Sequence, residues 1–261
     1  MKRLDGDIKN NTRQEFMEEW WDESFTQQID QNAYNTAPVE ALVRFTSHFL
    51  RARFQNPEQI ERLKFLEIGC GAGANLIWLA DRGIQPNGID ISQKALDLCK
   101  HRFQKNQLEH RLGDLKHCSA TSLPFEKDSF DGVLESCVFQ HLNEVDRKKA
   151  HQEAVRVLKP GGVFIGHMLS QNHTTYQLNK GTIQETEPGT LVLKSEEAKD
   201  KINLESIGLS HFFSKDEYRG LLDGCSLIDP CETTYELPLE EAARRGYKNY
   251  YQAMWVVYAI K

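Results

Sequence analysis

The chain has 261 residues, a length that fits one α/β domain with additions or at most two small domains. Hydrophobic residues make up 39% and charged residues 27%, and the formal net charge of −6 provides no general attraction to nucleic acid or to an anionic membrane. No apolar run is long enough to span a bilayer and the polar N-terminus has no apolar signal core, so we expect no membrane partner and a cytoplasmic location.

The first 55 residues are expected to contain two helices. Residues 11–30 carry apolar side chains at near-helical spacing, among them Phe16, Met17, Trp20, Trp21 and Phe25. Pro38 suits the first turn of a second helix, which is expected to continue to about Leu50. Because both helices precede the first expected core strand, we interpret residues 1–55 as an N-terminal helical cap on a domain formed by residues 56–261.

Strands and helices then alternate. Strands are predicted at 63–68, 85–90, 115–119, 130–136 and 163–168, and helices at 74–82, from Ser92 and from Glu144. This alternation is typical of a parallel sheet with helices on both faces. A capping box opens another helix at Ser214, and two closing strands are expected at 226–235 and 251–260.

Residues 169–212 interrupt this alternation. They consist largely of polar loop segments, with short possible strands at 191–193 and 202–204. We interpret this stretch as an insertion that forms a substrate lid.

The strand at 63–68 ends in an acidic residue and three glycines at every second position, namely Glu67, Gly69, Gly71 and Gly73. Glycines let the backbone approach a ligand closely, and the helix that follows points its free N–H groups into the same turn. The next strand ends in Asp90, whose carboxylate could accept hydrogen bonds from both hydroxyls of a ribose. Together these features predict a nucleotide-type binding site.

The glycine turn and Asp90 resemble the first two motifs of the class I S-adenosylmethionine-dependent methyltransferases. Three further segments extend the resemblance in the same order and spacing, namely LPFEKDSFD at 123–131, QHL at 140–142 and LKPGG at 158–162. The resemblance implies an α/β fold with a doubly wound, seven-stranded, mostly parallel sheet. It further implies helices on both faces, an antiparallel last strand and, with the cap, additional N-terminal helices.

The resemblance also implies contacts with the methionine and ribose parts of S-adenosylmethionine. Gly69, Gly71 and the backbone of Cys70 should face the methionine end. Glu67 should fix the loop or reach the methionine amino group through water, and Asp90 should hold the ribose hydroxyls.

For the adenine, Ile91 should pack on the ring, and Ser119, Ala120 and Thr121 occupy the place where the family clamps its edge. The family usually has aspartate at position 119, whereas a serine can accept a hydrogen bond from the adenine amino group only without charge. Asp114 is a rival for this role, although it comes five residues earlier.

Four more residues are candidates. Glu135, at the end of the fourth strand, should border the methionine moiety and the substrate, and Tyr34 and Arg44 of the cap could touch the cofactor. An arginine can bind the cofactor's carboxylate with two parallel hydrogen bonds, but Arg44 could equally be a solvated helix residue. His141 could take a proton from a hydroxyl acceptor as a catalytic base, or it could pack and hydrogen-bond within its own loop.

The resemblance implies methyl transfer from S-adenosylmethionine, with S-adenosylhomocysteine as product, to an O or N atom of a small-molecule acceptor, mainly by proximity and alignment. The alternatives are a methyltransferase acting on tRNA or protein, and a non-catalytic cofactor-binding or regulatory protein of the same fold. The six cysteines form no CxxC pair, so no metal site is expected, and no basic, aromatic-rich run suggests a nucleic-acid groove. The sequence indicates neither the acceptor nor the oligomeric state.

Overall fold

The structure is a computed structural model that describes residues 10–193, 208–244 and 246–261. The strand considered at 202–204 therefore lies outside the described residues. Within those ranges, no helix combines the length and the apolar character that crossing a membrane requires.

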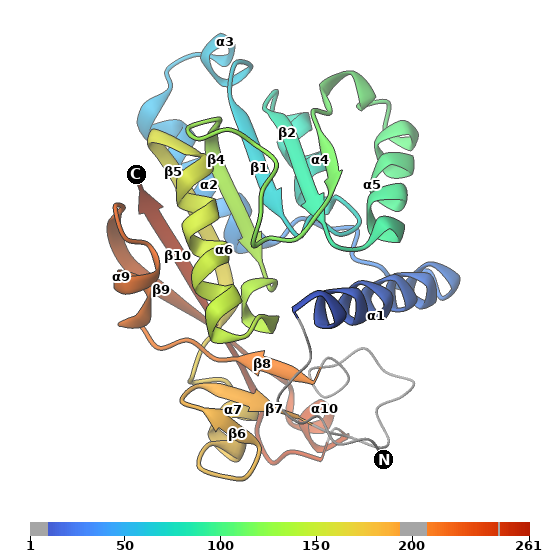
Figure 1. Ribbon diagram of the computed structural model, residues 1–261, viewed down its shortest axis with the longest axis vertical. Helices are drawn as coiled ribbons and strands as arrows, with labels where there is room; N and C mark the ends of the chain where they lie inside the picture. Colours follow the sequence, from blue (N-terminus) through green and yellow to red (C-terminus); the bar gives the residue numbers. More distant parts are fainter. Residues whose placement is uncertain (1–9, 194–207, 245) are drawn as a thin grey trace.

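Seven strands form the main sheet, in the order β3-β2-β1-β4-β5-β10-β9 (Figure 1). Their bounds, in that order, are Leu115–His117, Gln85–Asp90, Lys64–Ile68, Phe130–Ser136, Leu158–Leu169, Tyr251–Ile260 and Ser226–Glu236. Strand β10 pairs antiparallel with both β5 and β9, whereas the pairs from β3 to β5 are parallel. The prediction of a mostly parallel, seven-stranded sheet with an antiparallel last strand is confirmed.

Helices cover both faces of this sheet, as predicted. Helices α2 (Glu40–Arg53), α4 (Ala74–Asp81) and α5 (Gln93–Lys105) pack on one face, and α6 (Glu144–Val157) and α9 (Glu217–Leu221) pack on the other. Side chains of β1 alternate between the two cores, with Phe65 in the first and Leu66 in the second. Both of these side chains are fully buried, as expected for a strand covered on both faces.

Several boundaries differ from the sequence prediction, among them the end of β3, which stops at His117, and the starts of β5 and α9. Strand β5 begins at Leu158, directly after α6. Residues 159–162, which were expected to form a turn between the helix and the strand, belong to the strand itself. Gly161 has a φ of +78°, and the pairing of β5 with β4 shifts register there. Helix α9 begins at Glu217 rather than Ser214, although the Ser214 N–H does donate to the Glu217 carboxylate (2.6 Å), as a capping box requires.

The insertion forms a small antiparallel sheet beyond the ends of β5 and β10 (Figure 1). It consists of α7 (Thr174–Asn179), β6 (Glu185–Glu187), β7 (Thr190–Val192) and β8 (Leu209–His211). Apolar side chains of this unit pack on Leu169 and Met254, where β5 and β10 meet. Its function as a lid stays a prediction, as does the division of the chain into a cap and a domain.

The remaining helices are short, apart from the first. Helix α1 (Asn10–Asp30) crosses the edge of the sheet at which β1 and β2 end (Figure 1). Helices α3 (Pro57–Ile60) and α10 (Leu239–Arg244) and the 3-10 turns η1 (Glu109–Arg111) and η2 (Phe139–His141) complete the described elements.

Candidate functional site

The glycine turn after β1 leaves no room for a side chain at Gly69 or Gly73. The N–H groups of Gly69 and Cys70 both donate to the Ile89 carbonyl, at 2.8 and 2.9 Å, which ties the turn to β2. Gly69 has a φ of +71°, in the left-handed region, and a Cβ there would overlap the Val138 side chain. The turn therefore needs glycine both for its backbone conformation and for its packing against the loop after β4.

Asp90, at the end of β2, holds this turn from the other side. Its Oδ2 accepts from the Gly71 N–H (2.8 Å), and its Oδ1 accepts from the Ser92 N–H (2.9 Å). Burial raises the pKa of this carboxyl above its usual range, while the two backbone N–H groups oppose that rise. A carboxylate has about four acceptor positions, so Asp90 can still accept further hydrogen bonds on the side that faces the cavity beside it.

A cavity of about 250 Å³ lies between this turn, α1 and the loops after β3 and β4. Its lining residues are Met17, Trp21, Phe25, Gly69, Gly71, Ile89, Asp90, Ile91, Cys118, Ser119, Ala120, Ser136, Cys137, Val138, His141 and Leu142. Seven of the residues that were expected at the site therefore line this cavity. They are Gly69, Gly71, Asp90, Ile91, Ser119, Ala120 and His141.

The end of the cavity beyond Asp90 is formed by the loop after β3. Ser119 and Thr121 join their hydroxyl groups (2.9 Å), and the Thr121 N–H donates to the Ser119 oxygen (3.3 Å), so Thr121 supports the loop from outside the cavity. The rival residue, Asp114, directly precedes β3, lies beside Asn87 in the middle of β2 and pairs with Lys116 at 3.5 Å. Asp114 is not among the residues that line the cavity, so the geometry favours Ser119 and Ala120 at this end.

Glu67 lies behind the glycine turn rather than in the cavity wall. Its Oε1 accepts from the Asn75 amide (2.6 Å), and the Asn75 carbonyl oxygen accepts from the Val39 N–H (2.7 Å) just before α2. Burial raises the pKa of Glu67 to about 8, and its Oε2 has no partner among the described residues. This arrangement fits the expected loop-fixing role, which stays a prediction, and it adds Asn75 as a link between α2 and α4.

Glu135 and the Cys70 side chain point away from the cavity. Glu135 is buried, and its Oε1 accepts from the N–H groups of Val138 (2.6 Å) and Phe139 (3.0 Å). Burial raises its pKa to about 7. Glu135 therefore shapes the turn after β4 instead of bordering the cavity, which is lined by the next residue, Ser136. The Cys70 thiol packs into the core beside Gly88, so only its backbone faces the turn, as expected.

His141 lines the cavity, but both of its ring nitrogens are engaged. Nδ1 is 3.0 Å from the Leu209 carbonyl oxygen, which can only accept, so the ring proton lies on Nδ1. Nε2 then accepts from the Gln140 amide (3.2 Å), whose own oxygen accepts from the Leu169 N–H (2.9 Å). Burial lowers the pKa of His141 to about 4, so the imidazole is neutral. This geometry favours packing and loop fixation over catalytic base.

The two candidates of the cap lie outside the cavity. Arg44 is largely exposed on α2 and pairs with Glu40 at 2.7 Å, one helical turn away. Tyr34 is half-buried and stacks near Arg102, whose guanidinium carbon is 5.7 Å from the ring centre. Neither side chain reaches the cavity in this structure.

Arg102 of α5 is a residue that the sequence reading missed. Its buried guanidinium donates to the carbonyl oxygens of Ala72 (2.6 Å), Thr36 (3.1 Å) and Asn35 (3.3 Å). It therefore fastens the glycine turn to the segment that joins α1 to α2.

Replacing Arg102 with methionine should lower the free energy of unfolding by about 2 kcal/mol, because buried carbonyl groups lose a charged donor. It should also weaken cofactor binding, since Ala72 is no longer held. Chemical denaturation and calorimetric titration with S-adenosylmethionine measure the two effects. Arg44→Met is the matched control, and we expect it to change neither quantity. Loss of affinity in Arg44→Met with normal affinity in Arg102→Met would contradict this assignment.

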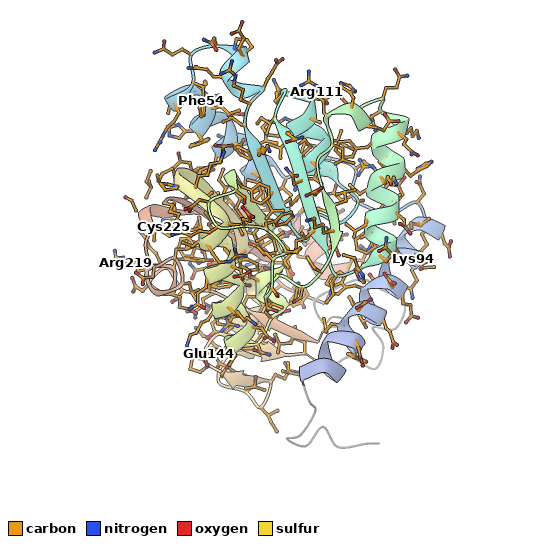
Figure 2. The ribbon with its side chains drawn as sticks, turned by 45° about the horizontal axis from the view of Figure 1, so that its top comes forward. Phe54, Lys94, Arg111, Glu144, Arg219 and Cys225 are labelled. Carbon is orange, nitrogen blue, oxygen red and sulfur yellow. The ribbon has the colours of Figure 1, made fainter. Side chains whose placement is uncertain are left out.

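Helix α1 closes the cavity through contacts at several points. Asp22 accepts from the Ser92 hydroxyl (2.5 Å) and from the Lys94 N–H (3.1 Å), and Figure 2 shows Lys94 at the start of α5, beside α1. Glu18 approaches His117 of β3 at 3.1 Å, and the Trp21 ring lies 6.1 Å from that of His141. These contacts fit the interpretation of α1 as a cap, which nevertheless stays a prediction.

The described residues form no cluster of side chains that could bind a metal ion, either at this site or elsewhere. No group of three or more histidine, cysteine, aspartate or glutamate side chains among them is arranged to hold a metal ion.

Comparison with known proteins agrees with this geometry. Residues 66–166 match the family model of a methyltransferase domain. Methyltransferase GfsG of Streptomyces halstedii is 37% identical over 103 residues, covering 38% of this chain and 35% of that protein. The ubiquinone biosynthesis O-methyltransferase of Pelagibacter ubique is 26% identical over 162 residues, covering 61% of this chain and 63% of that protein. The matches thus span less than two thirds of either relative.

A solved structure resembles the whole chain. The magnesium protoporphyrin IX methyltransferase of Synechocystis PCC 6803, crystallised with bound S-adenosylmethionine, superposes with a TM-score of 0.63. The superposition covers 99% of this chain and all of that chain at 11% sequence identity. At this identity the likeness shows the fold alone.

Proposed function

The chain belongs to the class I S-adenosylmethionine-dependent methyltransferase family, and we propose that it transfers the methyl group of this cofactor to an oxygen or nitrogen atom of a small-molecule acceptor. The observation that carries the proposal is Asp90. Its buried carboxylate is anchored to the glycine turn by Gly71 and faces the cavity with acceptor capacity to spare.

The residues around the cavity fit the cofactor. Asp90 would accept from the ribose hydroxyls, and Gly69 and Gly71 would leave room for the methionine part next to the backbone. Ile91 and Ala120 offer apolar surface to the adenine, while Ser119 offers a hydroxyl to its edge. The unpartnered Oε2 of Glu67 fits a water that bridges to the methionine amino group.

The protein's contribution to the reaction is alignment and exclusion of water. The cofactor supplies an electrophilic methyl group on a positively charged sulfur. Trp21 and Phe25 of α1 cover the cavity and keep solvent away from it, while the rigid loop after β4 fixes the wall at Ser136. His141 contributes through the shape of this wall, because both of its nitrogens are already bonded within the protein.

A small acceptor is favoured over a macromolecule. The Pelagibacter relative is an O-methyltransferase of ubiquinone biosynthesis. The formal net charge of −6 offers no general attraction to tRNA.

Incubation with S-adenosylmethionine that carries a labelled methyl group tests this proposal. A metabolite extract, bulk tRNA and a protein extract serve as three parallel acceptor pools. We expect label in the small-molecule pool. Label in the tRNA or protein pool would overturn the choice of acceptor, and calorimetric binding of the cofactor without transfer to any pool would favour a non-catalytic protein.

A further inference from the structure

Strand β5 carries a histidine, His167, near its carboxyl end and one strand away from the cavity wall. In the parallel register of β4 and β5, His167 lies directly beside Ser136, which lines the cavity. Side chains in register on neighbouring strands point to the same face of the sheet, and the strands are about 4.8 Å apart. His167 is not itself among the residues that line the cavity; it lies one strand beyond Ser136, on the side away from the glycine turn, where it would meet an acceptor that extends past Ser136.

The imidazole of His167 has no hydrogen-bond partner among the described residues. Its Nδ1 is buried and unpartnered, although the residue is partly exposed. The fully buried histidines differ in this respect, since each bonds a protein group through at least one ring nitrogen; they are His141, His151, His173 and His211. An unpaired buried ring nitrogen costs about 1–3 kcal/mol, so its presence calls for an explanation.

The ring is neutral, and its backbone is held rigidly. Burial alone lowers the pKa of His167 to about 4, so the imidazole offers one N–H group and one lone pair. The His167 carbonyl oxygen accepts from the Cys137 N–H (3.0 Å), and β10 pairs with the strand on its other side. A side chain on such a scaffold keeps its position better than one on a loop.

The space next to His167 is bounded by the insertion. Cys137, which lines the cavity, also packs against the cluster in which Leu191 of β7 and Tyr176 of α7 meet Leu169 of β5. The end of β5 thus lies between the expected cofactor position and the unit that we interpret as the lid.

We propose that His167 binds the nucleophilic O–H or N–H group of the methyl acceptor and positions it for transfer. This proposal rests on the proposed function and narrows the acceptor class to molecules whose methylated atom carries a hydrogen. In the step, a lone pair of the acceptor's oxygen or nitrogen forms the bond to the methyl carbon. The bond between that carbon and sulfur breaks, and its electron pair stays on sulfur. The attacking atom thereby becomes acidic, and its proton passes to the free lone pair of His167 and then to water.

Two substitutions of His167 and one control test this role. His167→Leu removes the lone pair at similar size, whereas His167→Gln keeps an oxygen that can accept a hydrogen bond. His48→Leu is the control, because His48 lies on α2 over the same face of the sheet, packs edge to face against Tyr258 and does not line the cavity. The probe is S-adenosylmethionine with a labelled methyl group, used with the metabolite fraction that the wild-type protein methylates.

We expect His167→Leu to lower kcat about 100-fold, in the range of a lost acid–base group, with the cofactor Kd unchanged by calorimetry. His167→Gln should recover part of that loss, and His48→Leu should behave like the wild type. Wild-type turnover in His167→Leu would overturn the proposal. The proposal would also be overturned if His167→Leu and His167→Gln lost the same amount of kcat and both bound the cofactor more weakly. That result would indicate that His167 only packs against its neighbours. If the wild-type protein itself methylates no fraction, the proposed function fails first and this inference fails with it.

Discussion

Asp90→Ala should weaken S-adenosylmethionine binding at least about 100-fold. Two hydrogen bonds from the ribose to a carboxylate are worth roughly 1.5–3 kcal/mol each, and alanine removes both. It also releases the Gly71 N–H, to which the Asp90 Oδ2 is bonded at 2.8 Å, so the turn itself loses its anchor. Calorimetric titration of wild-type and variant protein with the cofactor gives the ratio of dissociation constants.

The matched control for this variant is Asp114→Ala. Asp114 directly precedes β3, lies beside the middle of β2, does not line the cavity and is paired with Lys116. We expect wild-type affinity from it. Asp90→Asn separates geometry from charge, because an amide still accepts one backbone N–H group but cannot accept both ribose hydroxyls as a carboxylate does. Equal affinities of Asp90→Ala and the wild type would remove the central argument for the cofactor site.

The fold was predictable because its signals are local. Central strands such as β1 and β5 contain short apolar runs, and breaks between elements carry turn or capping residues, such as the Ser92 hydroxyl that accepts from the Ala95 N–H. The glycine turn and Asp90 were predictable for the same reason, since the chemistry of each is contained in a few adjacent residues. The extra length of β5 was not, because its continuation through Gly161 depends on pairing with a different strand.

Side-chain direction explains why some residues that were expected at the cofactor site do not line the cavity. Glu135 and Ser136 are neighbours on β4 and point to opposite faces, so only one of them reaches the cavity. Strand direction disfavours Asp114, which precedes β3, since ligands bind at the carboxyl ends of parallel strands. The spacing of Glu40 and Arg44, four residues apart on a helix, already favoured an exposed ion pair.

Arg102 and Asn75 were missed because their partners are far away in sequence. Arg102 bonds a carbonyl 30 residues earlier, and Asn75 accepts from a backbone group 36 residues earlier. No pattern within a single segment predicts such contacts. They appear only when α2 and the segment before it fold back onto the glycine turn.

Gly69→Ala should abolish measurable cofactor binding and lower the free energy of unfolding by about 3 kcal/mol. Two costs add up in this variant. The left-handed backbone at φ +71° costs an L-residue about 1–2 kcal/mol, and a methyl group forced into the Val138 side chain costs about 1–3 kcal/mol more. Relief of the clash moves either the turn or the loop after β4, and both line the cavity. Denaturant unfolding and calorimetry measure the two effects.

Gly181→Ala isolates the backbone part of that cost. Gly181 has nearly the same φ, +73°, but a Cβ there would meet nothing within 4 Å, and the residue is exposed and far from the cavity. We expect it to lose only the conformational term of about 1 kcal/mol and to bind the cofactor normally. Adding Val138→Ala to Gly69→Ala should restore part of the stability, because it removes the overlapping methyl groups. If Gly69→Ala and Gly181→Ala were equally stable and bound the cofactor equally well, the close contact between the turn and Val138 would not be what the site requires.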